Sequence, residues 1–230
     1  MNSEDLLFMC LWGFNMENMK ISVVIHKQLP ARDILNETLW RTNYNYFNEG
    51  KRKNGIYFYS YNNSTIPYYI GMSAAKSYNI LGRVWDELND YRNGEYYLPK
   101  EPDKLSTLEC FKSGSSPESF FIPGDFDKDD KYFQDILNTM LDNTKIIFSY
   151  LEMNPQVDDE KMRYVFYNIE ALFQKNIVAA KKLHPKWIGD EGKGYSSKQQ
   201  YNYIVDIVYE DPNLENILDT ELLLGKKKLR

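Results

Sequence analysis

Residues 55–71 read GIYFYSYNNSTIPYYIG, in which a Gly-Ile-Tyr and a Tyr-Ile-Gly triplet enclose eleven residues. Residues 56–59 and 67–70 are apolar and aromatic runs, and the Asn-Asn-Ser-Thr segment between them is typical of a polar turn. The pattern predicts a β-hairpin. In such a hairpin the two triplets would lie near each other, so that Tyr57 and Tyr69 face one site.

The rest of the chain contains helical and extended patterns on both sides of this segment. Apolar residues recur at three- and four-residue steps between Ser77 and Arg92, which predicts a helix with one buried face. Further predicted elements are helices at 31–42, 129–141 and 158–182, a central strand at 145–151, and a strand or helix at 201–209. Residues 93–128 are acidic and rich in proline, which predicts a long irregular excursion.

Length and composition set limits on the class of protein. At 230 residues the chain is long enough for one catalytic domain with elaborations. Its two cysteines, Cys10 and Cys110, have no zinc-ligand or disulfide spacing, so we expect a reducing, cytoplasmic location. The apolar run 6–14 is short, follows acidic residues and contains a glycine, so we expect neither a signal peptide nor a membrane span.

Charge is distributed unevenly along the chain. The formal net charge of −5 argues against a protein that coats nucleic acid by bulk electrostatics. Residues 40–100 and 161–230 each carry a net charge of +3, whereas residues 101–160 carry −9. The two basic segments are therefore the ones in which we expect phosphate contacts.

Together, the two triplets and their spacing resemble the GIY-YIG nuclease superfamily, which is named after them. Nuclease members share a hairpin with both triplets, a helix bearing an arginine, a third strand, and a helix bearing a glutamate. This resemblance implies an α/β (α+β) fold with a small, mostly antiparallel central sheet built on the hairpin and flanked by helices. A long insertion, 93–143, would precede the third strand. The expected domain limits are 1–50, an N-terminal elaboration; 51–189, the catalytic domain; and 190–230, a C-terminal extension.

The family's functional residues match this sequence one by one. Tyr57 and Tyr69 match the two triplet tyrosines, Arg83 matches the helix arginine, and Glu170 matches the metal-binding glutamate. The resemblance implies that Tyr57 takes a proton from the attacking water, that Arg83 contacts the phosphate, and that Tyr69 orients water or phosphate. Glu170 would hold Mg²⁺ or Mn²⁺, a cation that needs only one or two protein carboxylates. The expected substrate contacts are Lys51, Arg52, Lys53, Gly71 and Ser73.

Two positions depart from the family pattern. Many members have a histidine four residues after the arginine, where this chain has Glu87, which either pairs with Arg83 or supplies a second carboxylate. Many also have an asparagine after the glutamate helix, and residues 184–188 contain none.

A catalytic Tyr57 needs nearby positive charge, because an unperturbed tyrosine has a pKa of about 10 and would be protonated at neutral pH.

The leading hypothesis is a metal-dependent endonuclease that hydrolyses DNA phosphodiester bonds. The absence of HNH, zinc and helix-turn-helix elements favours a stand-alone restriction-type enzyme over a repair or homing enzyme. Restriction enzymes often dimerise to cut both strands, which makes a homodimer one possible state. The alternative, motivated by Glu87 and the missing asparagine, is a catalytically inactive module that binds nucleic acid or protein.

Overall fold

The computed structural model describes residues 19–74, 79–112, 121–122, 127–154, 156–183 and 203–225. The chain forms a mixed α/β fold, as expected. Its helices and strands, in chain order, are β1 (Met19–Pro30), α2 (Ala31–Leu35), α3 (Glu37–Phe47), η1 (Gly50–Lys53), β2 (Gly55–Tyr61), β3 (Tyr69–Ser73), α4 (Ile80–Arg92), β4 (Leu98–Pro99), η2 (Pro102–Leu105), η3 (Glu109–Phe111), β5 (Phe121–Ile122), α6 (Lys131–Asn143), β6 (Thr144–Asn154), α7 (Asp159–Lys181), β7 (Tyr203–Tyr209), η4 (Pro212–Leu214) and α8 (Thr220–Leu223).

A five-stranded sheet forms the centre of the molecule, with the order β3-β2-β6-β1-β7. All neighbours are antiparallel except β1 and β7, which are parallel. The expected mostly antiparallel sheet built on the hairpin is therefore confirmed, and the predicted third strand, β6, pairs with the first hairpin strand. The predicted domain limits stay a prediction, but β1 and β7 from the two terminal segments belong to this same sheet.

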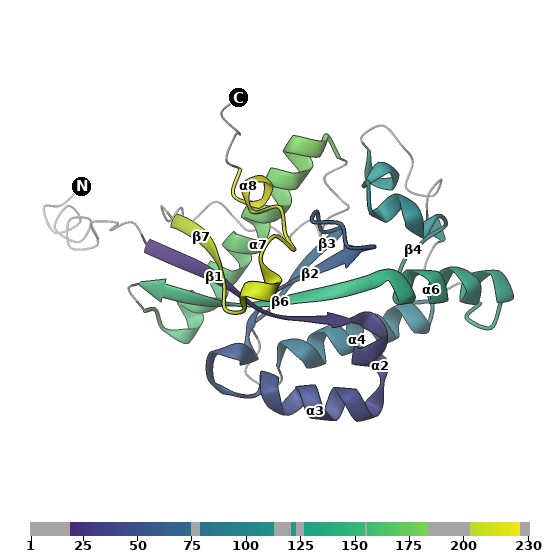
Figure 1. The fold of residues 1–230 in the computed structure, drawn as a ribbon, viewed down its shortest axis with the longest axis horizontal. Helices are drawn as coiled ribbons and strands as arrows, with labels where there is room; N and C mark the ends of the chain where they lie inside the picture. The colour runs from purple at the N-terminus through teal and green to yellow at the C-terminus, as the bar shows by residue number, and fades with distance from the viewer. Residues whose placement is uncertain are drawn as a thin grey trace, which may run out of the picture.

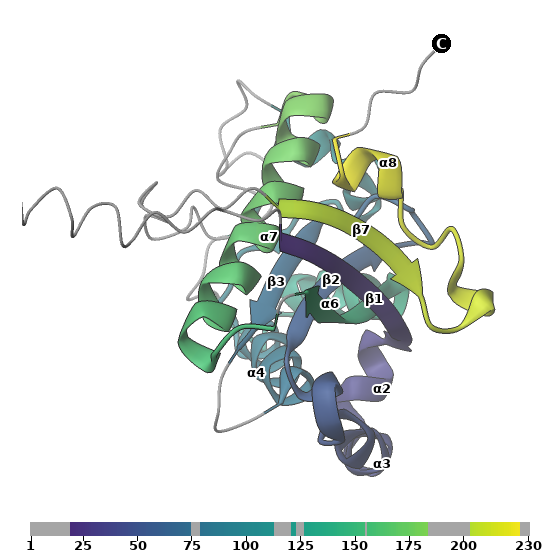
Figure 2. The same ribbon diagram turned by 90° about the vertical axis from the view of Figure 1, so that its left-hand side faces the viewer.

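Helices cover the sheet on both sides. Helices α2, α3 and α4 lie on one side, and α8 with the C-terminal half of α7 lies on the other (Figures 1 and 2). Because successive side chains of a strand point to opposite faces, Tyr57 of β2 faces α4 while Phe58 packs against Phe173 of α7, with ring centroids 5.8 Å apart. One face of the hairpin thus packs against α4, and the other packs against α7.

Local capping explains where two helices differ from the predicted limits. The single helix predicted for residues 31–42 is two helices, because Asn36 has extended backbone and its side chain accepts hydrogen bonds from the backbone N–H groups of Thr38 and Leu39. Likewise α4 begins at Ile80, because the side chain of Asn79 accepts a hydrogen bond from Gly82. Helices α6 and α7 lie within two residues of their predicted limits.

The segment predicted to be irregular, 93–128, is only partly so: its described residues include the two-stranded sheet of β4 and β5 and the short helices η2 and η3. The helix predicted at 129–141 is α6, whose apolar face is buried. Among the described helices, none is long and apolar enough to cross a membrane. The apolar run at 6–14 and the segment at 184–188 lie outside the described residues.

Candidate functional site

Glu87 lies at the centre of a hydrogen-bonded cluster between α4 and the hairpin. The Tyr57 hydroxyl donates to its Oε1 at 2.6 Å, and the Tyr69 hydroxyl donates to the same oxygen at 3.3 Å. The Tyr59 hydroxyl donates to Oε2 at 3.0 Å. Arg83, one turn earlier on α4, approaches Oε1 at 2.9 Å. Of the two roles left open for Glu87, pairing with Arg83 is the one observed.

The register of the hairpin brings these tyrosines together. Tyr57 is opposite Gly71 and Tyr59 is opposite Tyr69, so all the side chains at these positions point to the α4 face. A Cβ at Gly71 would lie 2.5 Å from the Tyr57 ring. The glycine of the second triplet therefore leaves room for the tyrosine of the first.

The cluster is buried around Glu87 and Tyr57 and exposed to solvent at Arg83. Glu87 is only 2% exposed and Tyr57 is 1% exposed, whereas the Arg83 side chain is 40% exposed. Tyr69 and Glu170 are half-buried. A ligand can reach Arg83 from solvent, while the hydroxyl of Tyr57 is held inside.

Burial is the largest influence on the pKa values of Tyr57 and Glu87. Burial raises the pKa of Tyr57 well above its usual value, and the Glu87 charge raises it further, against the lowering effect of Arg83. This direction is opposite to the one that a standing phenolate base requires. Burial also raises the pKa of Glu87, although Arg83 and the three hydroxyl donors oppose this effect. Tyr57 is therefore a protonated phenol whose proton is already directed at a carboxylate.

Glu170 approaches the cluster from α7. One turn later on the same helix, the Gln174 side chain donates to the backbone carbonyl of Ile70 in β3 at 3.2 Å, which fixes this part of α7 against the edge strand. The Glu170 carboxylate is close enough to raise the pKa of the Tyr69 hydroxyl, after the larger effects of burial and of Glu87 and Tyr91. Tyr57, Tyr69 and Arg83 thus all contact Glu87, and Glu170 is near enough to Tyr69 for its charge to act on that hydroxyl.

A divalent cation has one suitable ligand here. Within the described residues there is no cluster of three or more His, Cys, Asp or Glu side chains, so no all-protein ligand set is found among them. Mg²⁺ keeps several waters and takes its other ligands from one or two carboxylates and from phosphate. The half-buried carboxylate of Glu170 fits that requirement.

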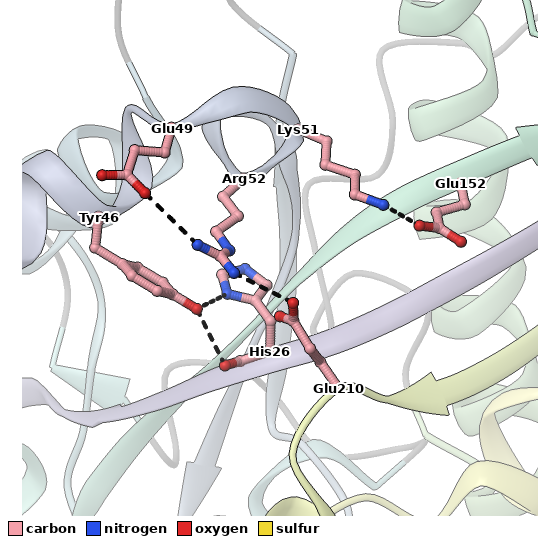
Figure 3. A network of polar contacts seen from close by, with 7 residues as sticks. All are labelled: His26, Tyr46, Glu49, Lys51, Arg52, Glu152 and Glu210. Carbon is pink, nitrogen blue, oxygen red and sulfur yellow. Dashed lines mark hydrogen bonds and ion pairs between the residues drawn. The ribbon is translucent and has the colours of Figure 1, made fainter.

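The expected substrate contacts are not all near the cluster. Arg52 stacks over the Tyr46 ring at 4.4 Å and pairs with Glu210 at 3.2 Å and with Glu49 at 3.8 Å (Figure 3). It joins η1 to α3 and to the end of β7, so we no longer expect it at a DNA phosphate. Lys51 pairs with Glu152 (Figure 3).

The remaining expected contacts occupy three different settings. Lys53 lines a cavity together with Lys51. Gly71 lies under the Tyr57 ring. Ser73 is buried, and its hydroxyl has no hydrogen-bond partner within the described part of the chain. Of the five, Gly71 belongs to the cluster itself.

Tyr59 was not among the expected site residues. It lies two positions after Tyr57 in a strand, where alternation puts both side chains on one face. The strand alternation could therefore have placed Tyr59 on the same face as Tyr57. Its role became visible only when the structure showed that the buried Glu87 carboxylate accepts hydrogen bonds from both hydroxyls.

The network in Figure 3 predicts an acid-sensitive fold. Burial, with Arg52 and Lys27 nearby, lowers the pKa of His26 to about 3 from 6.5. The unfolded chain then binds more protons than the folded one as pH falls from 6.5 toward 3, so stability is lost over that range. We expect urea unfolding to show a loss of about 1.4 kcal/mol per pH unit below 6.5.

The variant His26→Phe is the control for this effect. Phenylalanine suits the site because His26 already contacts Phe47 and Tyr150, with ring centroids 5.5 and 5.4 Å away. Its stability should change less between pH 7 and pH 5 than that of the wild type. Equal pH dependence in both proteins would contradict the assignment to His26.

Comparison with known proteins gives no match: no family model, no curated protein and no solved structure matches the chain.

Proposed function

We propose that this chain is a divalent-metal-dependent endonuclease that hydrolyses DNA phosphodiester bonds. The observation that carries the proposal is the convergence of Tyr57, Tyr69 and Arg83 on Glu87. Glu170 comes from α7 to within electrostatic reach of Tyr69. A phosphodiesterase needs a proton acceptor for water, positive charge at the phosphate, and a cation. This group of side chains supplies the first two and one ligand for the third.

The geometry suggests a relay in place of a phenolate base. Water that enters beside the exposed side of Arg83 when the phosphate binds gives its proton to the Tyr57 hydroxyl oxygen, while the Tyr57 proton moves over 2.6 Å to Glu87 Oε1. Burial makes Glu87 more basic than an ordinary carboxylate, which favours it as the final acceptor. The water oxygen bonds to phosphorus as the bond to the leaving oxygen breaks, and solvent water protonates that oxygen.

Arg83 and Glu170 have separate tasks in this scheme. The exposed side of the Arg83 guanidinium faces the phosphate and offsets the charge that grows on its non-bridging oxygens. Glu170 would hold Mg²⁺ or Mn²⁺, which supplies Lewis-acid polarisation of the phosphate when bound. Tyr69, whose hydroxyl is within electrostatic reach of Glu170, orients water or phosphate.

The test is cleavage of supercoiled and linear DNA with Mg²⁺ or Mn²⁺, compared with EDTA. Tyr57→Phe breaks the relay and Glu170→Ala removes the cation ligand, so each is expected to lower the rate at least about 100-fold. Tyr164→Phe and Glu215→Ala are matched controls at exposed positions and should cut at the wild-type rate. Equal cleavage in all five proteins would remove the proposed site.

A second function is a binding module without catalysis. The closed contact between Glu87 and Arg83 favours it, because such a pair also serves as an internal structural link. Binding of DNA, measured by fluorescence anisotropy, without cleavage under any metal condition would support this function. The restriction-type role, the cytoplasmic location and the homodimer remain proposals within the nuclease reading, and a defined cut site on plasmid DNA would support the first.

A further inference from the structure

A cavity of about 670 Å³ lies where η1, the start of β1, the end of β6 and the first turns of α7 meet. Sites for small molecules and cofactors occupy roughly 300–1,000 Å³. Asn54, which lines the cavity, directly precedes the first triplet, and Phe166 lies one helical turn before Glu170. The cavity therefore shares two chain segments with the candidate site, the residues that lead into β2 and helix α7, although none of the cluster residues lines it.

The charged residues of the cavity have a positive excess. Lys20, Lys51 and Lys53 line it, against the carboxylates of Glu152 and Asp159. Glu152 pairs with Lys51, and that pair is neutral as a whole, which leaves Lys20 and Lys53 against Asp159. Lysine binds phosphate as a flexible point charge. Phosphate is thus the charged group that this lining suits.

Three amide side chains also line the cavity: Asn54, Asn154 and Gln156. Each amide presents a carbonyl acceptor and an NH₂ donor. The edges of nucleic-acid bases present the same two kinds of group, and amides bind them in pairs of hydrogen bonds. A base is therefore a better partner for this polar part than a simple anion.

Most of the remaining lining consists of apolar side chains. Met153, Val157, Met162 and Phe166 contribute to it. Bases stack on aromatic rings, and methionine fits around flat apolar faces because its side chain is unbranched and polarizable. Apolar surface, amides and lysines together match the face, the edge and the phosphate of one nucleotide.

We propose that this cavity binds one unpaired nucleotide of the nucleic-acid substrate, with its base among the amide and apolar side chains and its phosphate at the lysines. The inference rests on the proposed function, because it assigns the cavity to the strand that reaches Tyr57 and Glu170. A base inside an intact duplex is stacked and paired, so the occupant comes from a single strand or is extruded from the helix.

The test measures binding in EDTA, where no metal-dependent cleavage occurs. A labelled single-stranded 12-mer should bind at least about tenfold more tightly than the blunt duplex of the same sequence. Met162→Trp fills the cavity and should weaken single-strand binding at least about tenfold. Lys53→Ala should reduce the slope of log K against log salt by about 0.7.

Two further variants guard against misfolding. Tyr164→Trp introduces the same indole at a position on the same helix that is 47% exposed and outside the cavity lining, and it should bind as the wild type does. Gln156→Ala removes one amide at an exposed position and should weaken binding about fivefold. Circular dichroism checks the fold of each variant.

The outcomes separate this inference from the proposed function. Equal affinity for single strand and duplex, or wild-type affinity in both Met162→Trp and Gln156→Ala, would overturn the assignment of the cavity. If those variants also cut DNA at the wild-type rate, the cavity is wrong and the nuclease stands. Loss of single-strand binding in the variants, with no cleavage by the wild type under any metal condition, would keep the cavity and reject the nuclease.

Discussion

Replacing Gly55 with alanine should disrupt the pairing of β2 with β6 in the central sheet and strongly destabilise the protein. A Cβ at this position would lie 1.6 Å from the backbone carbonyl oxygen of Ser149 in β6 and 3.2 Å from a methyl group of Ile80. The nearest atom belongs to backbone, so relief requires the first hairpin strand to move away from β6. Overpacking a core costs about 1–3 kcal/mol when side chains give way, and we expect more than about 3 kcal/mol here.

Gly50→Ala is the control for the Gly55 prediction. Gly50 has a φ of +52° and nothing within 4 Å of an added Cβ, so alanine there meets only backbone strain. That strain costs about 1–2 kcal/mol. Guanidinium unfolding, followed by circular dichroism, gives both values. A Gly55→Ala protein as stable as Gly50→Ala would contradict the close approach of β2 and β6.

Short-range patterns predicted much of the fold. The turn at residues 62–65 and the alternation around it located the hairpin, and the 3.6-residue period located α4 and α7. The break at Asn36 was missed, because an asparagine that caps a helix looks like one inside a helix until its side chain is seen to accept backbone N–H groups. The parallel pairing of β1 with β7 was also not predicted, since it joins residues about 180 apart.

Some residues of the candidate site could be predicted from the sequence, and others depend on contacts between distant parts of the chain. The family resemblance named Tyr57, Tyr69 and Arg83, and in the structure all three contact Glu87. Arg52 looked like a phosphate ligand in a basic run, but its partner Glu210 is 158 residues away. The sign of the pKa shift of Tyr57 likewise depends on burial, which no local pattern gives.

Replacing Glu87 with alanine should destabilise the protein by about 3–5 kcal/mol. The change removes the acceptor of three tyrosine hydroxyls and the partner of Arg83, and Tyr57 and Tyr59 are each only 1% exposed, so bulk solvent does not replace the carboxylate. Each buried donor left unpaired costs about 1–3 kcal/mol. Glu101→Ala is the control: Glu101 also pairs with a cation, Lys104 at 2.7 Å, but is 64% exposed, so at most about 0.5 kcal/mol is expected.

Glu87→Gln separates the structural role of Glu87 from its chemical role. Glutamine has the same shape and still offers one acceptor oxygen, so the loss of stability should be only about 1–2 kcal/mol. It cannot take the proton of Tyr57, however, so the relay predicts that DNA cleavage falls at least about 100-fold while urea unfolding stays cooperative. Cleavage at the wild-type rate by a folded Glu87→Gln protein would reject Glu87 as the proton acceptor and leave it as the residue that holds Tyr57, Tyr59 and Arg83 in place.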